Sequence, residues 1–264
     1  MHPEQTPAST ARRARVVAAI PSRYGSTRLP AKALHLLGGR PMVEHVYRRA
    51  KAASGLDRVV VLTDDERIGA AVEAFGGEWE MTPESCTSGT DRIAWAAAKW
   101  DADVVLNVQG DEPLIDPEGI GELAAHLANT PDDPIATLAA LAEEGDLADP
   151  NAVKVVLDQR GYALYFSRAG IPYQRQEGGP PVLKHLGIYG YQRAALLGFA
   201  CLPPTPLERA ESLEQLRALE NGIPIRVLRA RHGSLSVDTL ADAQRVERAL
   251  SDAARADPMD TSQR

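Results

Sequence analysis

The feature that most constrains the fold is a repeated alternation of short apolar runs with helical patterns. Apolar runs occupy positions 16–20, 59–62 and 104–108, and helical patterns occupy 41–55, 64–75 and 93–100. Short continuous apolar runs are typical of strands buried on both faces of a sheet. The alternation therefore predicts an α/β protein in which helices flank a mostly parallel, doubly wound central sheet.

The second half of the chain is less regular. Strand patterns occur at 135–141, 153–157, 162–166, 186–191 and 225–228, and helical patterns at 207–220 and 240–250. No internal repeat and no long linker divides the sequence, so insertions on a single sheet are the simplest organisation. We expect a flexible arm at 1–14, one domain at 15–250 and a frayed tail at 251–264.

Composition excludes several classes of protein. The chain carries 29 Lys and Arg against 36 Asp and Glu, a net charge of −7, which argues against general nucleic-acid binding. No apolar run approaches the roughly 20 residues that a membrane-spanning helix needs. Cys86 and Cys201 lie far apart without partners at metal spacing, which excludes a disulfide framework or zinc ribbon and favours the reduced cytoplasm.

A basic loop at 20–32 follows the first predicted strand. It contains Arg23, Arg28 and Lys32 together with the small residues Gly25 and Ser26. In open α/β sheets ligands bind at this end of the strands, and Arg forks, a Lys charge and free backbone N–H groups suit a triphosphate. A solvated basic turn is the structural alternative. The spacing of glycines around the lysine does not match a Walker A loop.

Two acidic positions are candidate magnesium ligands. Asp111 follows Gly110 at the end of the 104–108 strand, and Asp238 precedes the last predicted helix. Mg²⁺ on a triphosphate commonly takes one or two carboxylates. The alternative is a capping role, since Asp111 sits in a turn and Asp238 or Thr239 could cap the helix.

Other segments have strong structural explanations. Thr90 or Asp91 could cap the 93–100 helix, although such a helix end could also meet a nucleotide. The glycines at 119 and 121 resemble part of a dinucleotide-binding motif. That motif directly follows a strand, whereas here Pro117 begins a helix and no predicted strand precedes the glycines, so we do not assign it. No Ser/His/Asp spacing indicates covalent hydrolysis, and a lone histidine such as His185 is more often structural than a ligand.

Taken in order, these motifs resemble the 3-deoxy-manno-octulosonate (Kdo) cytidylyltransferases, the CMP-Kdo synthetases. The resemblance covers about 16–246. The resembling segments are 20–32, 39–42, 63–65, 88–92, 107–113, 165–168, 184–191, 213–217 and 237–239.

The resemblance implies a Rossmann-like nucleotidyltransferase fold with a smaller inserted sheet or dimerisation region, and a homodimer. It implies coupling of CTP to Kdo or a related 2-keto sugar acid, with Mg²⁺ as cofactor and pyrophosphate as the second product. The anomeric hydroxyl would attack the α-phosphorus in line. Two alternatives stay open: a sugar-1-phosphate nucleotidyltransferase and a non-catalytic nucleotide-sugar-binding protein.

The resemblance also assigns roles by position. The catalytic residues would be Arg23, Lys32, Asp111 and Asp238, of which Asp111 and Asp238 bind the metal. The nucleotide would contact Arg23, Ser26, Arg28, Lys32, Ser88, Thr90 and Gln109. The sugar acid would contact Gln109, Arg168, His185, Tyr189, Glu214 and Gln215. One departure is Cys86, where the family usually has His.

Overall fold

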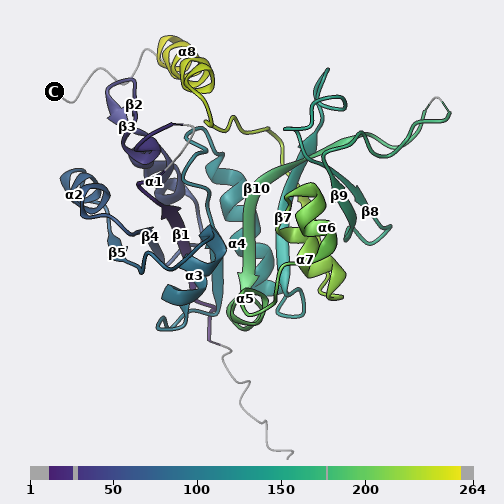
Figure 1. The fold of residues 1–264 in the computed structure, drawn as a ribbon, viewed down its shortest axis with the longest axis horizontal. Coiled ribbons are helices and arrows are strands. Elements are labelled where there is room, and N and C mark those ends of the chain that lie inside the picture. The colour runs from purple at the N-terminus through teal and green to yellow at the C-terminus, as the bar shows by residue number, and fades with distance from the viewer. Residues whose placement is uncertain (1–11, 26–28, 177, 257–264) are drawn as a thin grey trace, which may run out of the picture.

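The computed structural model describes residues 12–25, 29–176 and 178–256 and is built on one twisted sheet (Figure 1). Its main path runs in the order β11-β7-β10-β6-β1-β4-β5. The bounds are β1 Val16–Ser22, β4 Arg58–Thr63, β5 Trp79–Met81, β6 Val104–Asn107, β7 Ile135–Leu141, β10 Leu183–Gln192 and β11 Ile225–Arg229. On this path β10 runs antiparallel to both of its neighbours, and all other pairs are parallel. The predicted mostly parallel sheet is confirmed.

Helices cover both faces of the sheet. One buried cluster packs α1 (Met42–Ala52), α2 (Glu66–Ala74) and α4 (Pro117–Asn129) against one face. The other packs α3 (Gly89–Ala97), α5 (Arg193–Ala200) and α7 (Gln215–Glu220) against the opposite face. Alternate residues of β1 belong to the two clusters, as expected for a strand buried on both sides.

Smaller elements extend this frame. The strands β8 (Lys154–Leu157) and β9 (Ala163–Ser167) form a hairpin that pairs with the start of β10. A separate antiparallel pair, β2 (Leu36–Leu37) and β3 (Arg40–Pro41), follows the short helix η1 (Lys32–Leu34). The last helix, α8 (Leu240–Ala256), returns to this N-terminal region and lies beside β2 (Figure 1).

Several expected boundaries are wrong. The predicted helix at 207–220 is two helices, α6 (Pro206–Glu211) and α7, because Ser212 adopts a left-handed conformation with φ of 51°. The closing helix extends beyond the predicted end at 250, to Ala256. Helix α5 and strand β5 were not predicted from the sequence.

The chain ends are only partly described. Most of the predicted arm at 1–14 and the tail beyond 256 lie outside the described residues, so the domain boundaries stay predictions. The described end of the arm is held to the segment before β6 by ion pairs, including that of Arg12 with Asp103 at 2.9 Å. None of the helices in the described part of the chain is both long and apolar enough to cross a membrane.

Candidate active site

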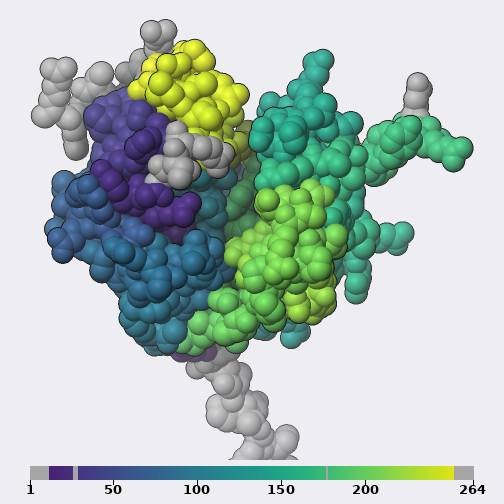
Figure 2. All heavy atoms as spheres, in the orientation of Figure 1, coloured from purple at the N-terminus to yellow at the C-terminus, as the bar shows by residue number. Residues whose placement is uncertain are grey.

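A cavity of about 290 Å³ opens where the carboxyl ends of β1 and β6 lie side by side. Figure 2 shows this face of the molecule, with a hollow between the surfaces of the N-terminal half and of α6 and α7. Six of the predicted site residues line the cavity. They are Arg23, Lys32, Ser88, Gln109, Asp111 and Asp238. The sheet therefore brings together residues that the sequence separates widely, at the edge where ligands bind in open α/β sheets.

Lys32 lies between the two predicted metal ligands. Its Nζ donates to Oδ2 of Asp111 at 2.6 Å and to Oδ1 of Asp238 at 2.9 Å. Because one nitrogen contacts both oxygens, the two carboxylates are close to each other. The three side chains are only partly accessible, 19%, 28% and 38% for Lys32, Asp111 and Asp238.

Backbone contacts hold these carboxylates in position. The Val237 N–H donates to the carbonyl oxygen of Asp111 at 2.8 Å, and the Val237 side chain is fully buried. The Asp238 N–H donates to the carboxylate of Asp242 in the first turn of α8. Next to Asp111, Gly110 packs so closely on β1 that an added Cβ would lie 2.9 Å from the Pro21 carbonyl oxygen.

The donor set fits a magnesium ion that arrives with phosphates. Two adjacent carboxylates already share one cation, the Lys32 ammonium, so their geometry suits a positively charged ligand. In the described part of the chain, no group of three or more His, Cys, Asp or Glu side chains could hold a metal by itself. Mg²⁺ commonly uses one or two carboxylates, substrate phosphates and water, which agrees with this arrangement.

The amino end of α3 forms another wall of the cavity. Ser88 caps the helix, and its hydroxyl accepts from the Asp91 N–H while the Asp91 carboxylate accepts from the Ser88 N–H. A helix cap at this turn was predicted, but the predicted residue is wrong: the N-cap is Ser88, and Thr90 and Asp91 lie within the first turn of α3. Ser88 also lines the cavity, whereas Thr90 is buried behind it. Ser26 and Arg28 lie outside the described residues, and Arg23 is exposed at the cavity wall.

The lining residues that were not assigned a role from the sequence include Ser22, Cys86 and Arg92. The Arg92 guanidinium is buried and donates to Asp64 Oδ2 at 2.7 Å and to the hydroxyl of Thr82. The Ser22 hydroxyl is buried and has no hydrogen-bond partner in the described part of the protein. Burial raises the pKa of the Cys86 thiol. The position of Arg92 at the end of the 88–92 motif was a signal for a role in the site. An exposed cation on the helix surface was an equally good explanation of that position.

A second group of predicted residues lies on β10. Tyr189 pairs with Asn107, the last residue of β6, so the antiparallel β10 carries His185 beyond the end of β6. The His185 and Tyr189 rings are 5.2 Å apart, and the Tyr189 hydroxyl has no hydrogen-bond partner among the described residues. Burial lowers the pKa of His185 to about 3, so the imidazole is neutral near pH 7; its Nε2 lies 2.9 Å from Thr137 Oγ1.

Glu214 joins this group to the amino end of α3. Its Oε2 accepts from the Thr90 hydroxyl at 2.5 Å, and burial raises the pKa of the Glu214 carboxyl. The neighbouring Gln215 is buried. The Thr90–Glu214 hydrogen bond therefore joins a residue predicted to lie near the cytidine to a residue predicted to contact the sugar acid.

Arg168 is not among the cavity-lining residues. Its Nε donates to the Glu211 carbonyl oxygen at 2.7 Å, and its two terminal nitrogens donate to the carbonyl oxygens of Pro150 and Ser212. These contacts fix the guanidinium beside the turn that precedes Glu214. A guanidinium has five N–H groups, and these contacts use three carbonyl acceptors. A contact between Arg168 and the sugar acid therefore stays a prediction.

A buried carboxyl next to the metal ligands was also missed. Glu112 is 6% exposed, and its Oε2 has no hydrogen-bond partner among the described residues. Burial and the negative charge of Asp111 raise the pKa of Glu112 to about 7. Only the fold reveals this burial, because Glu112 follows Asp111 directly in a polar turn.

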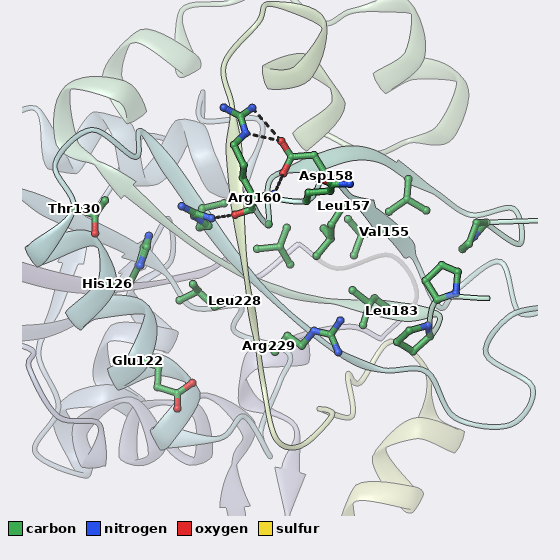
Figure 3. Close-up of a pocket in the computed structure, with 18 of the residues that line it drawn as sticks. Glu122, His126, Thr130, Val155, Leu157, Asp158, Arg160, Leu183, Leu228 and Arg229 are labelled. Atoms are coloured by element: carbon green, nitrogen blue, oxygen red, sulfur yellow. Dashed lines mark hydrogen bonds and ion pairs between the residues drawn. The ribbon is translucent and has the colours of Figure 1, made fainter. Parts of the chain in front are cut away.

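A larger cavity, of about 1230 Å³, lies on another part of the surface (Figure 3). Apolar side chains such as Val155, Leu157 and Leu183 line it, together with residues of α4 and β11. None of the predicted site residues lines this cavity. Its polar groups are partly paired with each other, as Arg160 is with Asp158. Its lining is therefore less suited to phosphate chemistry than the smaller cavity.

Comparison with known proteins identifies the family of the chain. Residues 17–227 match the family model described as cytidylyltransferase. A 3-deoxy-manno-octulosonate cytidylyltransferase of Myxococcus xanthus is 50% identical, over 88% of this chain and 95% of that protein. A protein of the same name from Geobacter sulfurreducens is 48% identical, over 88% and 97%.

Solved structures of similar fold include a member of the same family. A CMP:2-keto-3-deoxy-manno-octonic acid synthetase complexed with CTP superposes with a TM-score of 0.87 and 43% identity, over 90% of this chain and 99% of that chain. A 4-diphosphocytidyl-2C-methyl-D-erythritol synthase from Anaerococcus prevotii has a TM-score of 0.60 at 12% identity, over 90% and 96%. The second likeness shows the fold alone.

Proposed function

The chain belongs to the 3-deoxy-manno-octulosonate cytidylyltransferase family, and from this premise we propose that it transfers CMP from CTP to Kdo with release of pyrophosphate. The observation that carries the proposal is the cavity at the strand ends, in which Lys32 lies between Asp111 and Asp238. A nucleotide triphosphate with Mg²⁺ needs carboxylates that bind the metal and cations that bind the phosphates, and this cavity brings both together.

The residues of the cavity have distinct roles in this proposal. Asp111 and Asp238 would hold Mg²⁺, which when bound withdraws charge from the phosphates and lowers the pKa of the sugar hydroxyl. Arg23 and Lys32 stabilise the negative charge that grows on the phosphate oxygens as the anomeric hydroxyl attacks the α-phosphorus. Once both substrates are bound, these groups would hold the reacting atoms in one orientation, which lowers the entropic cost of the attack.

The remaining predicted residues bind the two substrates. We assign the cytidine to the amino end of α3, where Ser88 lines the cavity and α3 presents its positive end. The sugar acid is assigned to the neighbouring group that includes His185, Tyr189 and Glu214. The contact between Thr90 and Glu214 supports this arrangement, because it links the two subsites directly. Both substrates and the free thiols of Cys86 and Cys201 suit a cytoplasmic enzyme.

A homodimer is part of the proposal, and the larger cavity is its candidate interface. A second copy would cover the apolar walls around Leu157 and the adjacent Tyr173, whose side chain is 87% exposed. Light scattering should find a dimer for the native chain and a monomer for Leu157→Lys. Leu164→Lys is the matched control and should stay dimeric, because Leu164 is an exposed residue of β9 that does not line the cavity. A monomeric native chain would contradict the dimer.

The activity is tested by supplying CTP and Mg²⁺ with Kdo, with other 2-keto sugar acids or with sugar 1-phosphates, and following the products by ³¹P NMR. We expect pyrophosphate and a CMP ester with Kdo and no reaction with the sugar phosphates. Turnover of a sugar 1-phosphate would favour the alternative nucleotidyltransferase. Nucleotide binding without turnover of any acceptor would favour a binding protein.

A further inference from the structure

The contact of Lys32 with two carboxylates has a consequence for metal binding. The ammonium nitrogen touches an oxygen of Asp111 and an oxygen of Asp238, at 2.6 and 2.9 Å. It therefore takes up coordination capacity that both carboxylates would offer to a divalent cation. The lysine side chain is 81% shielded from solvent, so water screens these contacts less than at an open surface.

The carboxylates do not depend on Lys32 for their position. The backbone of Asp111 is joined to Val237, and Val237 is fully buried in a cluster with Leu37, Met42 and Val246. The Asp238 backbone is held in turn by the carboxylate of Asp242. A chain without the Lys32 charge would thus keep two neighbouring carboxylates with less positive charge between them.

We propose that Lys32 is the counter-cation of the ligand-free site and makes tight binding of a divalent metal depend on the nucleotide. Without a nucleotide, Mg²⁺ has to displace the Lys32 ammonium from the two carboxylates, and no phosphate is present to accept hydrogen bonds from the displaced ammonium. When a triphosphate enters the same cavity, its oxygens can accept from Lys32, whose flexible four-carbon stem permits the exchange. Since coupling between ligands is reciprocal, metal and nucleotide favour each other's binding.

The inference rests on the proposed function for the identity of the nucleotide, but its central consequence needs neither nucleotide nor sugar. Removing the Lys32 charge should strengthen the binding of metal alone. A lysine that only contributed to phosphate binding would leave the affinity for metal alone unchanged. The two roles are therefore separable in the absence of substrates.

The test titrates Mn²⁺, as a probe of the Mg²⁺ site, into the full chain without nucleotide and measures free Mn²⁺ by electron paramagnetic resonance. The variants are Lys32→Met and Lys32→Gln, which differ in polarity but both remove the charge. Lys184→Met is the matched control, because Lys184 pairs with Asp146 at 3.0 Å outside the cavity and has similar exposure. Thermal unfolding with and without Mg²⁺ gives a second readout.

We expect both Lys32 variants to bind Mn²⁺ at least 10-fold more tightly than the native chain and Lys184→Met to match the native chain. Mg²⁺ should also raise the unfolding temperature of the Lys32 variants more than that of the native chain. Equal or weaker Mn²⁺ binding by both Lys32 variants would overturn the proposal, as would equal tightening in Lys184→Met. A failure of CMP transfer would bear on the proposed function and leave this result intact.

Discussion

The Val237 N–H donates a hydrogen bond to the carbonyl oxygen of Asp111 at 2.8 Å. This bond joins the turn after β6 to the segment before α8, which are distant in sequence. As a result the side chains of Asp111 and Asp238 reach the same lysine. The metal-binding geometry proposed above therefore depends on backbone packing as much as on the charged groups.

Gly110 is the first test of this packing. A methyl group at Gly110 would lie 2.9 Å from the Pro21 carbonyl oxygen and from Ser22 Oγ, so β1 and the turn must move apart. We expect Gly110→Ala to lower the free energy of unfolding by about 1–3 kcal/mol. Turnover should fall as well, because the shift displaces Asp111. Chemical denaturation and a pyrophosphate assay measure the two effects.

Gly198→Ala is the control for that substitution. Gly198 lies in α5, and an added Cβ would have no neighbour within 4 Å. Since alanine is favoured over glycine in a helix by about 1 kcal/mol, this variant should be as stable as the native chain or more so. Equal stability of the two variants would show that the close approach at Gly110 is unimportant.

The regular part of the fold could be predicted because its signals are local. The strands β1, β4 and β6 are continuous apolar runs, and Asp65 and Asp116 cap α2 and α4 through their side chains. Elements that depend on tertiary contacts were missed. Helix α5 follows β10 directly with no capping side chain, and the left-handed Ser212 that separates α6 from α7 is not a glycine.

Part of the site could also be predicted from the sequence. The basic loop and Asp111 follow predicted strands, so their convergence at one sheet edge could be inferred from topology. Asp238 has no such signal, because a cap is an equally good explanation of its sequence context. The burial of Arg92 and Glu112 could not be predicted, since it depends on packing between distant segments.

Arg168→Lys tests the assignment of the sugar-acid group. Lysine cannot reproduce three fixed contacts with backbone carbonyl groups, and it lacks the fork that pairs with a carboxylate. We expect the KM for Kdo to rise at least 10-fold with little change in the KM for CTP. Arg193→Lys serves as the control, because the Arg193 guanidinium also donates to backbone carbonyl oxygens, those of Ala97 and Ala98, but lines neither cavity. An unchanged KM for Kdo would remove Arg168 from the sugar pocket.

His185 should make stability depend on pH. Its pKa is lowered from 6.5 to about 3 by burial, so folding favours the neutral ring. The corresponding stability is present above pH 6.5 and is lost as the pH falls from 6.5 towards 3, because the unfolded chain then binds an additional proton. The slope approaches about 1.4 kcal/mol per pH unit within this window.

The pH effect is isolated by comparison with His185→Asn. Denaturant unfolding of both proteins between pH 7.5 and 5 should show the native chain losing stability relative to the variant as the pH falls. Other groups titrate equally in both proteins and cancel in the difference. A difference that is independent of pH would mean that His185 is accessible to protons in the folded state.

The most direct test of the central claim is the rate of pyrophosphate release by Asp111→Asn at saturating CTP, Kdo and Mg²⁺. The substitution keeps the shape of the side chain but removes the charge that Lys32 and the metal require. We predict a loss of at least about 100-fold, roughly 3 kcal/mol of transition-state stabilisation, with native unfolding behaviour and with Asp252→Asn, on exposed α8, as an active control. Near-native release by Asp111→Asn would contradict the claim that Lys32, Asp111 and Asp238 surround the reacting triphosphate.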